Sequence, residues 1–152
     1  MNIAISSDHR GRDAVKHLAD RLADVGHNVT VMGTAADEGP TDYPDQAAEV
    51  GRSVADGINA AGILICGTGI GMSIAANKVK GVRAAAVHDE LTAQLSRSHN
   101  DANVLCVSAD LLGERKIDEI VDIWLRTDFE GGRHERRVSK IGALECTVEP
   151  KT

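Results

Sequence analysis

The stretch Ile63-Leu-Ile-Cys-Gly-Thr-Gly-Ile-Gly-Met-Ser73 decides the fold of this chain. An apolar, strand-like run ends at Cys66, three glycines follow at alternate positions, and a helical pattern begins at Ser73. A strand that leads through glycines into a helix directs backbone N–H groups and the positive end of the helix dipole at one spot. The same field stabilises the thiolate form of a nearby cysteine. The segment therefore predicts an anion site with a reactive thiol beside it.

Four further aliphatic runs resemble the one that ends at Cys66, and helical patterns separate them. Gly26 is a plausible stop for the first helix and Pro44 a plausible opening residue for the second. Because the runs lack polar alternation, we expect five buried parallel strands in one α/β domain over residues 1–152, with a loose end at about 147–152. The five runs cover residues 2–6, 28–32, 62–66, 82–87 and 103–108, and the two late helices cover about 117–125 and 131–145.

Composition narrows the class of protein. The 152 residues are 42% hydrophobic with one Trp, one Tyr and one Phe, so the core must be aliphatic. The net charge of −6 argues against a nucleic-acid or membrane-surface protein. No apolar run approaches the roughly 20 residues of a membrane span, and the first residues do not resemble a signal peptide. These features predict a cytoplasmic protein.

The three cysteines do not predict a disulfide framework or a zinc site. Cys66, Cys106 and Cys146 are odd in number and form no closely spaced pair. Cys106 lies inside a strand-like run and is expected to be a small core residue. Only Cys66 has a glycine-rich loop beside it.

The carboxyl ends of the predicted strands give the candidate site residues, because parallel sheets bind ligands at that edge. Asp8 and His9 could move protons or bind a hydroxyl group, although a helix N-cap with a solvated histidine fits the pair equally well. The other candidates at strand ends are Ser7, Arg10, Gly33, Thr34, Asp42, Tyr43, the segment 66–71, His88, Asp89, Ala109 and Asp110.

Two further polar groups lie outside the strand ends. His99 and Asn100 follow a helical run, and we expect the short loop after them to place them near the site, although a surface histidine is the simpler alternative. Arg133, His134 and Arg137 form a basic cluster in an acidic chain, with Arg133 and Arg137 on one helix face. Guanidinium forks match phosphate oxygens, but a solvated helix face is an equal alternative.

The glycine spacing argues against a dinucleotide site. The segment 67–71 reads GxGxG and not GxGxxG, and it follows the third strand where the fingerprint would follow the first. A tight turn that needs positive φ explains part of the pattern. It does not explain why Cys66 and Thr68 flank the same turn.

The chain resembles ribose-5-phosphate isomerase type B, in the ribose/galactose isomerase superfamily, nearly end to end. The motifs that carry the resemblance are Ser7-Asp-His9, Thr41-Asp-Tyr-Pro44, the segment 63–71, Ile74-Ala-Ala-Asn-Lys78, Leu95-Ser-Arg-Ser-His-Asn-Asp101 and Phe129-Glu-Gly-Gly-Arg-His134. The resemblance implies a Rossmann-like three-layer sandwich with a C-terminal helix. It also implies a homodimer, or a tetramer, with active sites at the subunit interface.

The resemblance further implies a metal-free and cofactor-free interconversion of D-ribose 5-phosphate and D-ribulose 5-phosphate, a step of the pentose phosphate pathway. Cys66 would move the proton between C1 and C2, and His99, with Asp8, would open the sugar ring. Thr68 would face the developing oxyanion. The substrate-binding residues would be His9, Tyr43, Gly67, Gly69, Ile70, Gly71, Asn100, Arg133, His134 and Arg137.

Two positions refine the resemblance. Some members lack the cysteine and use a glutamate a few residues later, but Met72 stands there in this chain, so we expect the cysteine type. Many members have an arginine near the phosphate where this chain has Asp110. A carboxylate there should weaken phosphate binding unless Arg10 or Arg115 compensates. Asp110 therefore leaves two alternative functions open. One is an isomerase of allose 6-phosphate, galactose 6-phosphate or a tetrose phosphate, and the other is a non-catalytic metabolite-binding module.

Overall fold

The structure is a computed structural model that describes residues 1–33 and 39–145. Thr34, Cys146 and the predicted loose end at 147–152 lie outside the described residues. The elements alternate along the chain as β1 (Asn2–Ser7), α1 (Arg12–Asp24), β2 (Asn28–Val31), α2 (Tyr43–Ala55), β3 (Ala61–Cys66), α3 (Ile70–Ala76), β4 (Ala84–Ala86), α4 (Glu90–Ser98), β5 (Val104–Ser108), α5 (Glu114–Arg126) and α6 (Arg133–Leu144).

The five strands form one parallel sheet in the order β2-β1-β3-β5-β4. This confirms the predicted α/β fold. The chain leaves β1 toward β2 and then returns to the other side of β1 with β3, so the direction of winding reverses between β1 and β3. Ligands in open parallel sheets bind beyond the carboxyl ends of the strands at such a reversal, and Cys66 ends β3 there.

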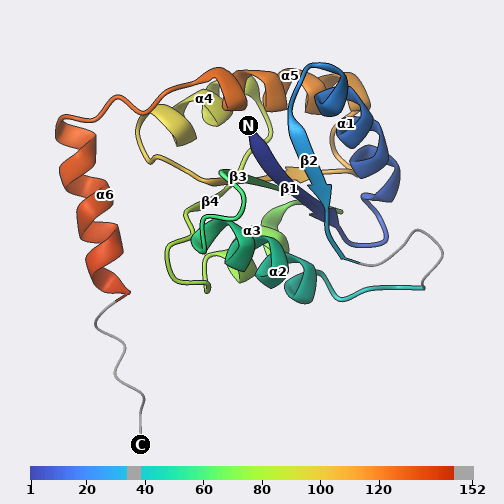
Figure 1. Cartoon of the computed structure of the whole chain (residues 1–152), viewed down its shortest axis with the longest axis horizontal. Helices are drawn as coiled ribbons and strands as arrows, with labels where there is room; N and C mark the ends of the chain where they lie inside the picture. Colours follow the sequence, from blue (N-terminus) through green and yellow to red (C-terminus); the bar gives the residue numbers. More distant parts are fainter. Residues whose placement is uncertain (34–38, 146–152) are drawn as a thin grey trace, which may run out of the picture.

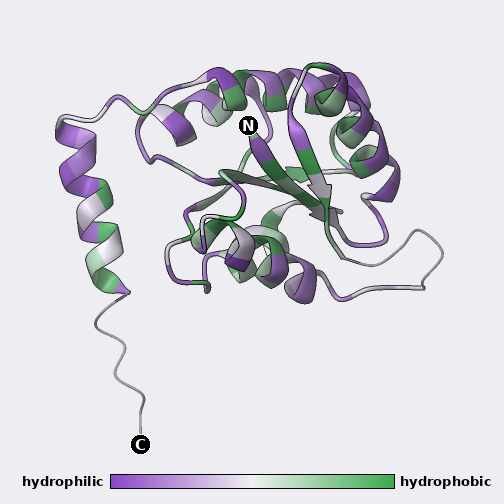
Figure 2. Ribbon diagram, in the orientation of Figure 1, coloured by the Kyte–Doolittle hydropathy of each residue, from purple (hydrophilic) through white to green (hydrophobic). Residues whose placement is uncertain are grey.

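Helices cover both faces of the sheet and make a three-layer sandwich (Figure 1). Alternate side chains of a strand point to opposite faces, so Ile63 and Ile65 pack with α1 and α5 while Leu64 and Cys66 pack with α2 and α3. The hydrophobic residues concentrate in the strands and in the helix faces that meet them (Figure 2). The core is aliphatic, with Trp124 of α5 as its fully buried aromatic side chain.

Three details differ from the sequence-based expectation. The prediction that all five strands are buried is wrong for β2, whose residues are mainly exposed, and for β4, which is partly exposed. Both strands lie at the edges of the sheet. In addition, α3 begins at Ile70, three residues before the expected start at Ser73, because Gly69 adopts a left-handed conformation and caps the helix directly.

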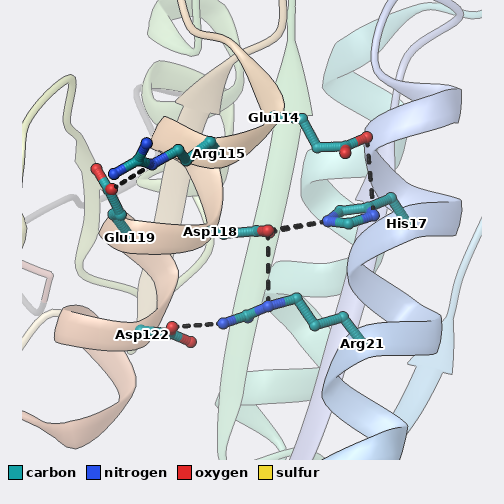
Figure 3. A network of polar contacts seen from close by, with 7 residues as sticks. All are labelled: His17, Arg21, Glu114, Arg115, Asp118, Glu119 and Asp122. Atoms are coloured by element: carbon teal, nitrogen blue, oxygen red, sulfur yellow. Dashed lines mark hydrogen bonds and ion pairs between the residues drawn. The ribbon is translucent and has the colours of Figure 1, made fainter.

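A polar network joins α1 to α5 on one face of the sheet (Figure 3). The His17 Nε2 atom lies 3.0 Å from an Asp118 carboxylate oxygen, and Arg21 contacts both Asp118 and Asp122. These contacts join residues about 100 positions apart. They fix the register of α5 on α1 and so set where the chain leaves α5 toward α6.

Helix α6 stands apart from the layered body (Figure 1). Among its residues His134 is the buried one, while Ile141 and Leu144 are exposed. Hydrophobic residues lie mainly in its C-terminal half (Figure 2). Among the helices of the described segments, none has the length and apolarity that a membrane crossing requires.

Candidate active site

The thiol of Cys66 lies at the carboxyl end of β3 and faces the turn into α3. The Gly69 N–H donates a hydrogen bond to the Cys66 Sγ atom, with an N···S distance of 3.1 Å. Cys66 is 5% exposed. The sulfur thus accepts a backbone N–H at the start of α3, where the helix dipole is positive. The predicted combination of a thiol and a glycine loop is therefore present in the structure.

The glycine loop after Cys66 is shaped by close neighbours. Gly69 has φ +77°, and a Cβ atom there would lie 3.1 Å from the Val107 carbonyl carbon. A Cβ atom at Gly71 would lie 2.7 Å from the ring of Tyr43. Tyr43 begins α2 and thus closes the far end of the loop, as expected for a residue that lines the site.

Thr68 is exposed in the loop, and its Oγ1 atom accepts a hydrogen bond from the Ile70 N–H at 3.3 Å. The Thr68 carbonyl oxygen lies 3.2 Å from the His88 Nε2 atom. Because His88 follows β4, the structure brings a second imidazole, besides that of His9, to this edge of the sheet. The sequence places His88 at a strand end but gives no reason to choose it.

Asp8 and His9 follow β1 at the same edge. The Asp8 N–H donates to the Ile65 carbonyl oxygen at 3.2 Å, and an Asp8 carboxylate oxygen accepts from the Arg10 N–H at 2.9 Å. Asp8 is buried, whereas His9 is exposed. Asp8 therefore serves the turn before α1 and also lies beside the end of β3. The expected helix N-cap at Asp8 is wrong, because Gly11 is the N-cap of α1 and the Asp8 carboxylate bonds to Arg10 before the helix begins. A proton-transfer role of Asp8 stays a prediction.

Arg10, one of the two residues expected to compensate Asp110, forms a two-point fork with it. The Arg10 Nε atom lies 3.0 Å from one carboxylate oxygen of Asp110, and Nη2 lies 2.7 Å from the other. Arg10 therefore compensates the charge of Asp110 by direct pairing. The other compensating residue considered, Arg115, pairs with Glu119 instead.

His99 and Asn100 lie at the opposite edge of the sheet. They follow α4, which returns the chain to the amino ends of the strands, and the next strand residue, Val104, pairs with Gly62 near the start of β3. A strand of six residues spans about 16 Å. The expectation that the loop brings His99 near Cys66 therefore does not hold within one chain.

The loop that carries His99 and Asn100 is held firmly. Asp101 adopts a left-handed backbone with φ 46°, and its carboxylate oxygens lie 3.0 Å from Arg83 and 3.1 Å from Arg97. Aspartate tolerates this conformation better than most residues. The two ion pairs thus fix the turn directly after Asn100.

His99 stacks on His134 at the start of α6. The ring centroids are 4.1 Å apart and the planes differ by 8°. A Glu130 carboxylate oxygen lies 3.6 Å from the His134 Nε2 atom and 4.0 Å from the His99 Nε2 atom. Burial lowers the pKa of His134, and His99 and Arg133 shift it in the same direction. Neutral imidazoles stack without charge repulsion.

His99, Glu130 and His134 are also the described residues that could hold a metal ion, with donor atoms within 4.8 Å of one another. The Arg133 Nε atom lies 3.4 Å from the His134 Nε2 atom and donates to it. A guanidinium so close opposes a cation electrostatically. We therefore interpret the group as a hydrogen-bonding and stacking cluster, with the predicted basic residues Arg133 and Arg137 on the adjoining turns of α6.

Comparison with known proteins identifies the family. The model of the Ribose/Galactose Isomerase family matches residues 3–141. The chain belongs to the ribose/galactose isomerase family. It is 46% identical to ribose-5-phosphate isomerase B of Escherichia coli, with 94% of this chain and 95% of the relative covered. It is 41% identical to D-erythrulose-4-phosphate isomerase of Pectobacterium atrosepticum, with 95% of each covered.

A solved structure agrees with this assignment. Ribose-5-phosphate isomerase B of Mycoplasma genitalium, determined with bound ribulose-5-phosphate, superposes with a TM-score of 0.93 at 44% identity over 97% of each chain. The Rossmann-like sandwich predicted from the resemblance is thereby confirmed. The chain is an isomerase, and the alternative of a non-catalytic binding module is set aside.

Replacing Gly69 by alanine should distort the loop around Cys66. The left-handed backbone and the contact with the Val107 carbonyl both oppose a Cβ atom, so we expect a loss of about 1–3 kcal/mol in the free energy of unfolding. Gly113→Ala is the matched control, since Gly113 has φ −75° and open space around its Cα. Denaturant unfolding of both variants checks this. Equal stability of the two would contradict the steric account.

The docking of α6 should weaken at acidic pH. Because the folded pKa of His134 lies below its unfolded value, the unfolded chain binds the proton first, and stability is lost as the pH falls below about 6.5. Amide-exchange protection factors of α6 at pH 7.5 and 5.5 measure the effect. His134→Phe keeps a flat ring without a titrating group and should remove most of the pH dependence. A wild-type α6 equally protected at both pH values would refute the prediction.

Proposed function

We propose that this chain interconverts D-ribose 5-phosphate and D-ribulose 5-phosphate through an enediolate, with Cys66 as the base. The observation that carries the proposal is the Gly69 N–H bonded to the Cys66 sulfur at the end of β3. The substrate fits the names of several relatives and the ribulose-5-phosphate bound in the Mycoplasma genitalium structure. A cytoplasmic location stays a prediction from the sequence.

The reaction moves one proton between two carbons and one between two oxygens, and it needs no co-reactant. The Cys66 thiolate takes the C2 proton of the open-chain aldose, and the electron pair moves into the C1–C2 bond and onto the carbonyl oxygen at C1. The thiol then returns a proton to C1, and the proton of the C2 hydroxyl passes to the C1 oxyanion, so that C2 becomes the ketone and C1 carries the hydroxyl group. Donors placed at a developing oxyanion lower such barriers, and the N–H groups of the glycine loop with the Thr68 hydroxyl are suited to that role.

The ring of the sugar must open before the carbon-bound proton can be removed. We assign this step to His99, with Asp8 as its helper. His99 is 35% exposed at its side chain, so the imidazole remains accessible beside its stack on His134. Proton transfer requires heavy atoms about 3 Å apart. A separation of about 16 Å between the two edges of the sheet is incompatible with this step inside one chain.

A homodimer with shared active sites removes this difficulty. In a two-fold dimer, the edge that carries Cys66 in one copy can face the edge that carries His99 in the other, and the symmetry builds the same site twice. Asn100, Arg133, His134 and Arg137 would then come from the same copy as His99. His9 and Tyr43 would come with Cys66.

Exposed apolar side chains support this dimer. Ile70 and Ile74 are one turn apart on α3 and are 52% and 59% exposed. Ile141 and Leu144 are one turn apart on α6 and are 43% and 66% exposed. A groove of about 220 Å³ lies between Ile141 and the Asn100 loop. One apolar pair thus lies beside the Cys66 half of the site and the other beside the His99 half. Exposed apolar patches of this kind are typical of surfaces that a second copy covers.

A second candidate function is isomerisation of another aldose phosphate. Asp110 favours it, because a carboxylate near the loop changes how an anionic substrate is held, and a relative of this chain is named D-erythrulose-4-phosphate isomerase. The deciding experiment ranks kcat/KM for aldose phosphates of four, five and six carbons. A tetrose or hexose phosphate that exceeds ribose 5-phosphate by orders of magnitude would replace the proposed substrate.

Cys66→Ala should abolish turnover and leave binding of ribulose 5-phosphate intact. Loss of a proton-transfer group costs about 10²–10⁴-fold in rate. Cys106→Ala is the control, since burial raises the pKa of the Cys106 thiol and keeps it protonated. Turnover by purified protein and calorimetric binding measure the two effects. Near-normal turnover of Cys66→Ala would refute the base assignment.

Two inactive variants should complement each other if the site is shared. Co-expression of Cys66→Ala with His99→Asn gives mixed dimers in which one of two sites is intact, so about a quarter of wild-type activity should return. Co-expression of Cys66→Ala with the Cys66→Ala/His99→Asn double variant is the control and should stay inactive. No recovery in purified mixed dimers would mean that Cys66 and His99 act within one chain.

A further inference from the structure

The fork between Arg10 and Asp110 joins two loops that are 100 residues apart in sequence. It makes two contacts, of 3.0 Å at the Arg10 Nε atom and 2.7 Å at Nη2. The Arg10 backbone N–H is fixed separately by the Asp8 carboxylate at 2.9 Å. A two-point fork fixes the plane of a guanidinium as well as its position. Arg10 is therefore held at both its backbone and its tip.

The fork lies over the first glycine of the loop. A Cβ atom at Gly67 would be 2.9 Å from an Asp110 carboxylate oxygen and 3.3 Å from the Arg10 Nε atom. The Asp110 N–H also donates to the Gly67 carbonyl oxygen at 3.2 Å. Since Gly67 directly follows Cys66, the guanidinium lies within a few ångströms of the residue next to the proposed base.

The fork leaves part of Arg10 available. A guanidinium group has five N–H donors, and the fork uses one on Nε and one on Nη2. The Arg10 side chain is 54% exposed, so the donors outside the fork can be reached by a ligand. An exposed ion pair contributes little to stability by itself. The combination of a fixed plane and accessible donors suits a binding role better than a purely structural one.

The charges around Gly67 support the same conclusion. Asp8 and Asp110 place two carboxylates at this edge, and both oppose a dianionic phosphosugar. Arg10 bonds to Asp8 through its backbone N–H and to Asp110 through its guanidinium, whose charge offsets that of Asp110 directly. With Asp110 on one side of the guanidinium, an anion can bind on the free side without direct contact with the carboxylate.

We propose that Arg10 binds the phosphate group of the substrate and that Asp110 is the positioning residue that holds its guanidinium over Gly67. The proposal rests on the proposed function in one respect, that the ligand is an aldose phosphate. The charge of Asp110 alone would weaken phosphate binding. By holding the Arg10 guanidinium in place, Asp110 supports binding instead.

The test compares Arg10→Ala and Asp110→Asn with the wild-type dimer in two assays. One is calorimetric binding of inorganic phosphate, and the other is the KM and kcat for the best aldose phosphate of the panel. Arg10→Ala should weaken phosphate binding and raise KM by about tenfold or more with kcat nearly unchanged. Asp110→Asn should shift both in the same direction by about threefold, because the guanidinium is no longer fixed.

Matched controls come from a second arginine–carboxylate pair. Arg115 and Glu119 pair at 3.0 Å on α5, so Arg115→Ala and Glu119→Gln make the same charge changes away from Gly67 and should leave both assays unchanged. Arg10→Lys keeps the charge without the fork, so its phosphate affinity and KM should lie between those of the wild type and Arg10→Ala. It replaces Arg10→Ala if that variant fails to fold.

Three results would overturn the proposal. They are unchanged phosphate affinity and KM in Arg10→Ala, tighter phosphate binding in Asp110→Asn, and an equal loss in Arg115→Ala. If the panel contains no substrate, the proposed function fails. The phosphate affinities still decide the role of Arg10, since they require no turnover.

Discussion

The common direction of the five strands is the constraint on which the candidate site depends. A parallel sheet gathers all its carboxyl ends at one edge, so Asp8, Cys66 and Asp110 meet there although they are far apart in sequence. The same geometry sends each helix back to the amino edge. His99 ends such a returning helix and is therefore kept away from Cys66 by the depth of the sheet.

Each glycine of the GxGxG loop is required for a different steric reason. Gly67 makes room for the fork of Arg10 and Asp110, Gly69 adopts positive φ against the Val107 carbonyl, and Gly71 accepts the ring of Tyr43. None of these reasons involves a pyrophosphate. The loop is thus a tight turn in which the Gly69 N–H reaches the Cys66 thiol, which explains why its spacing departs from the dinucleotide fingerprint.

Much of the fold could be predicted from the sequence, because buried strands and amphipathic helices leave clear periodicity. The half of the candidate site at Cys66 could be predicted once the strands were recognised, because the residues that follow parallel strands share one edge of the sheet. The placement of His99 was missed, although its position between a helix and a strand assigns it to the amino edge. The sequence offered Arg10 and Arg115 as partners of Asp110 but could not choose between them, because a contact between exposed loops leaves no periodic pattern.

The two described cysteines have different surroundings because they lie at different positions along neighbouring strands. Cys66 and Cys106 point to the same face of the sheet from neighbouring strands. Cys106 lies in mid-strand, its backbone groups are engaged in the sheet, and burial raises the pKa of its thiol. Cys66 lies one residue before the chain turns, where the Gly69 N–H is free of the sheet and can reach the sulfur. The proposed role of Cys66 as a base therefore depends on its place at the end of a strand that leads into a glycine turn, a place that Cys106 lacks.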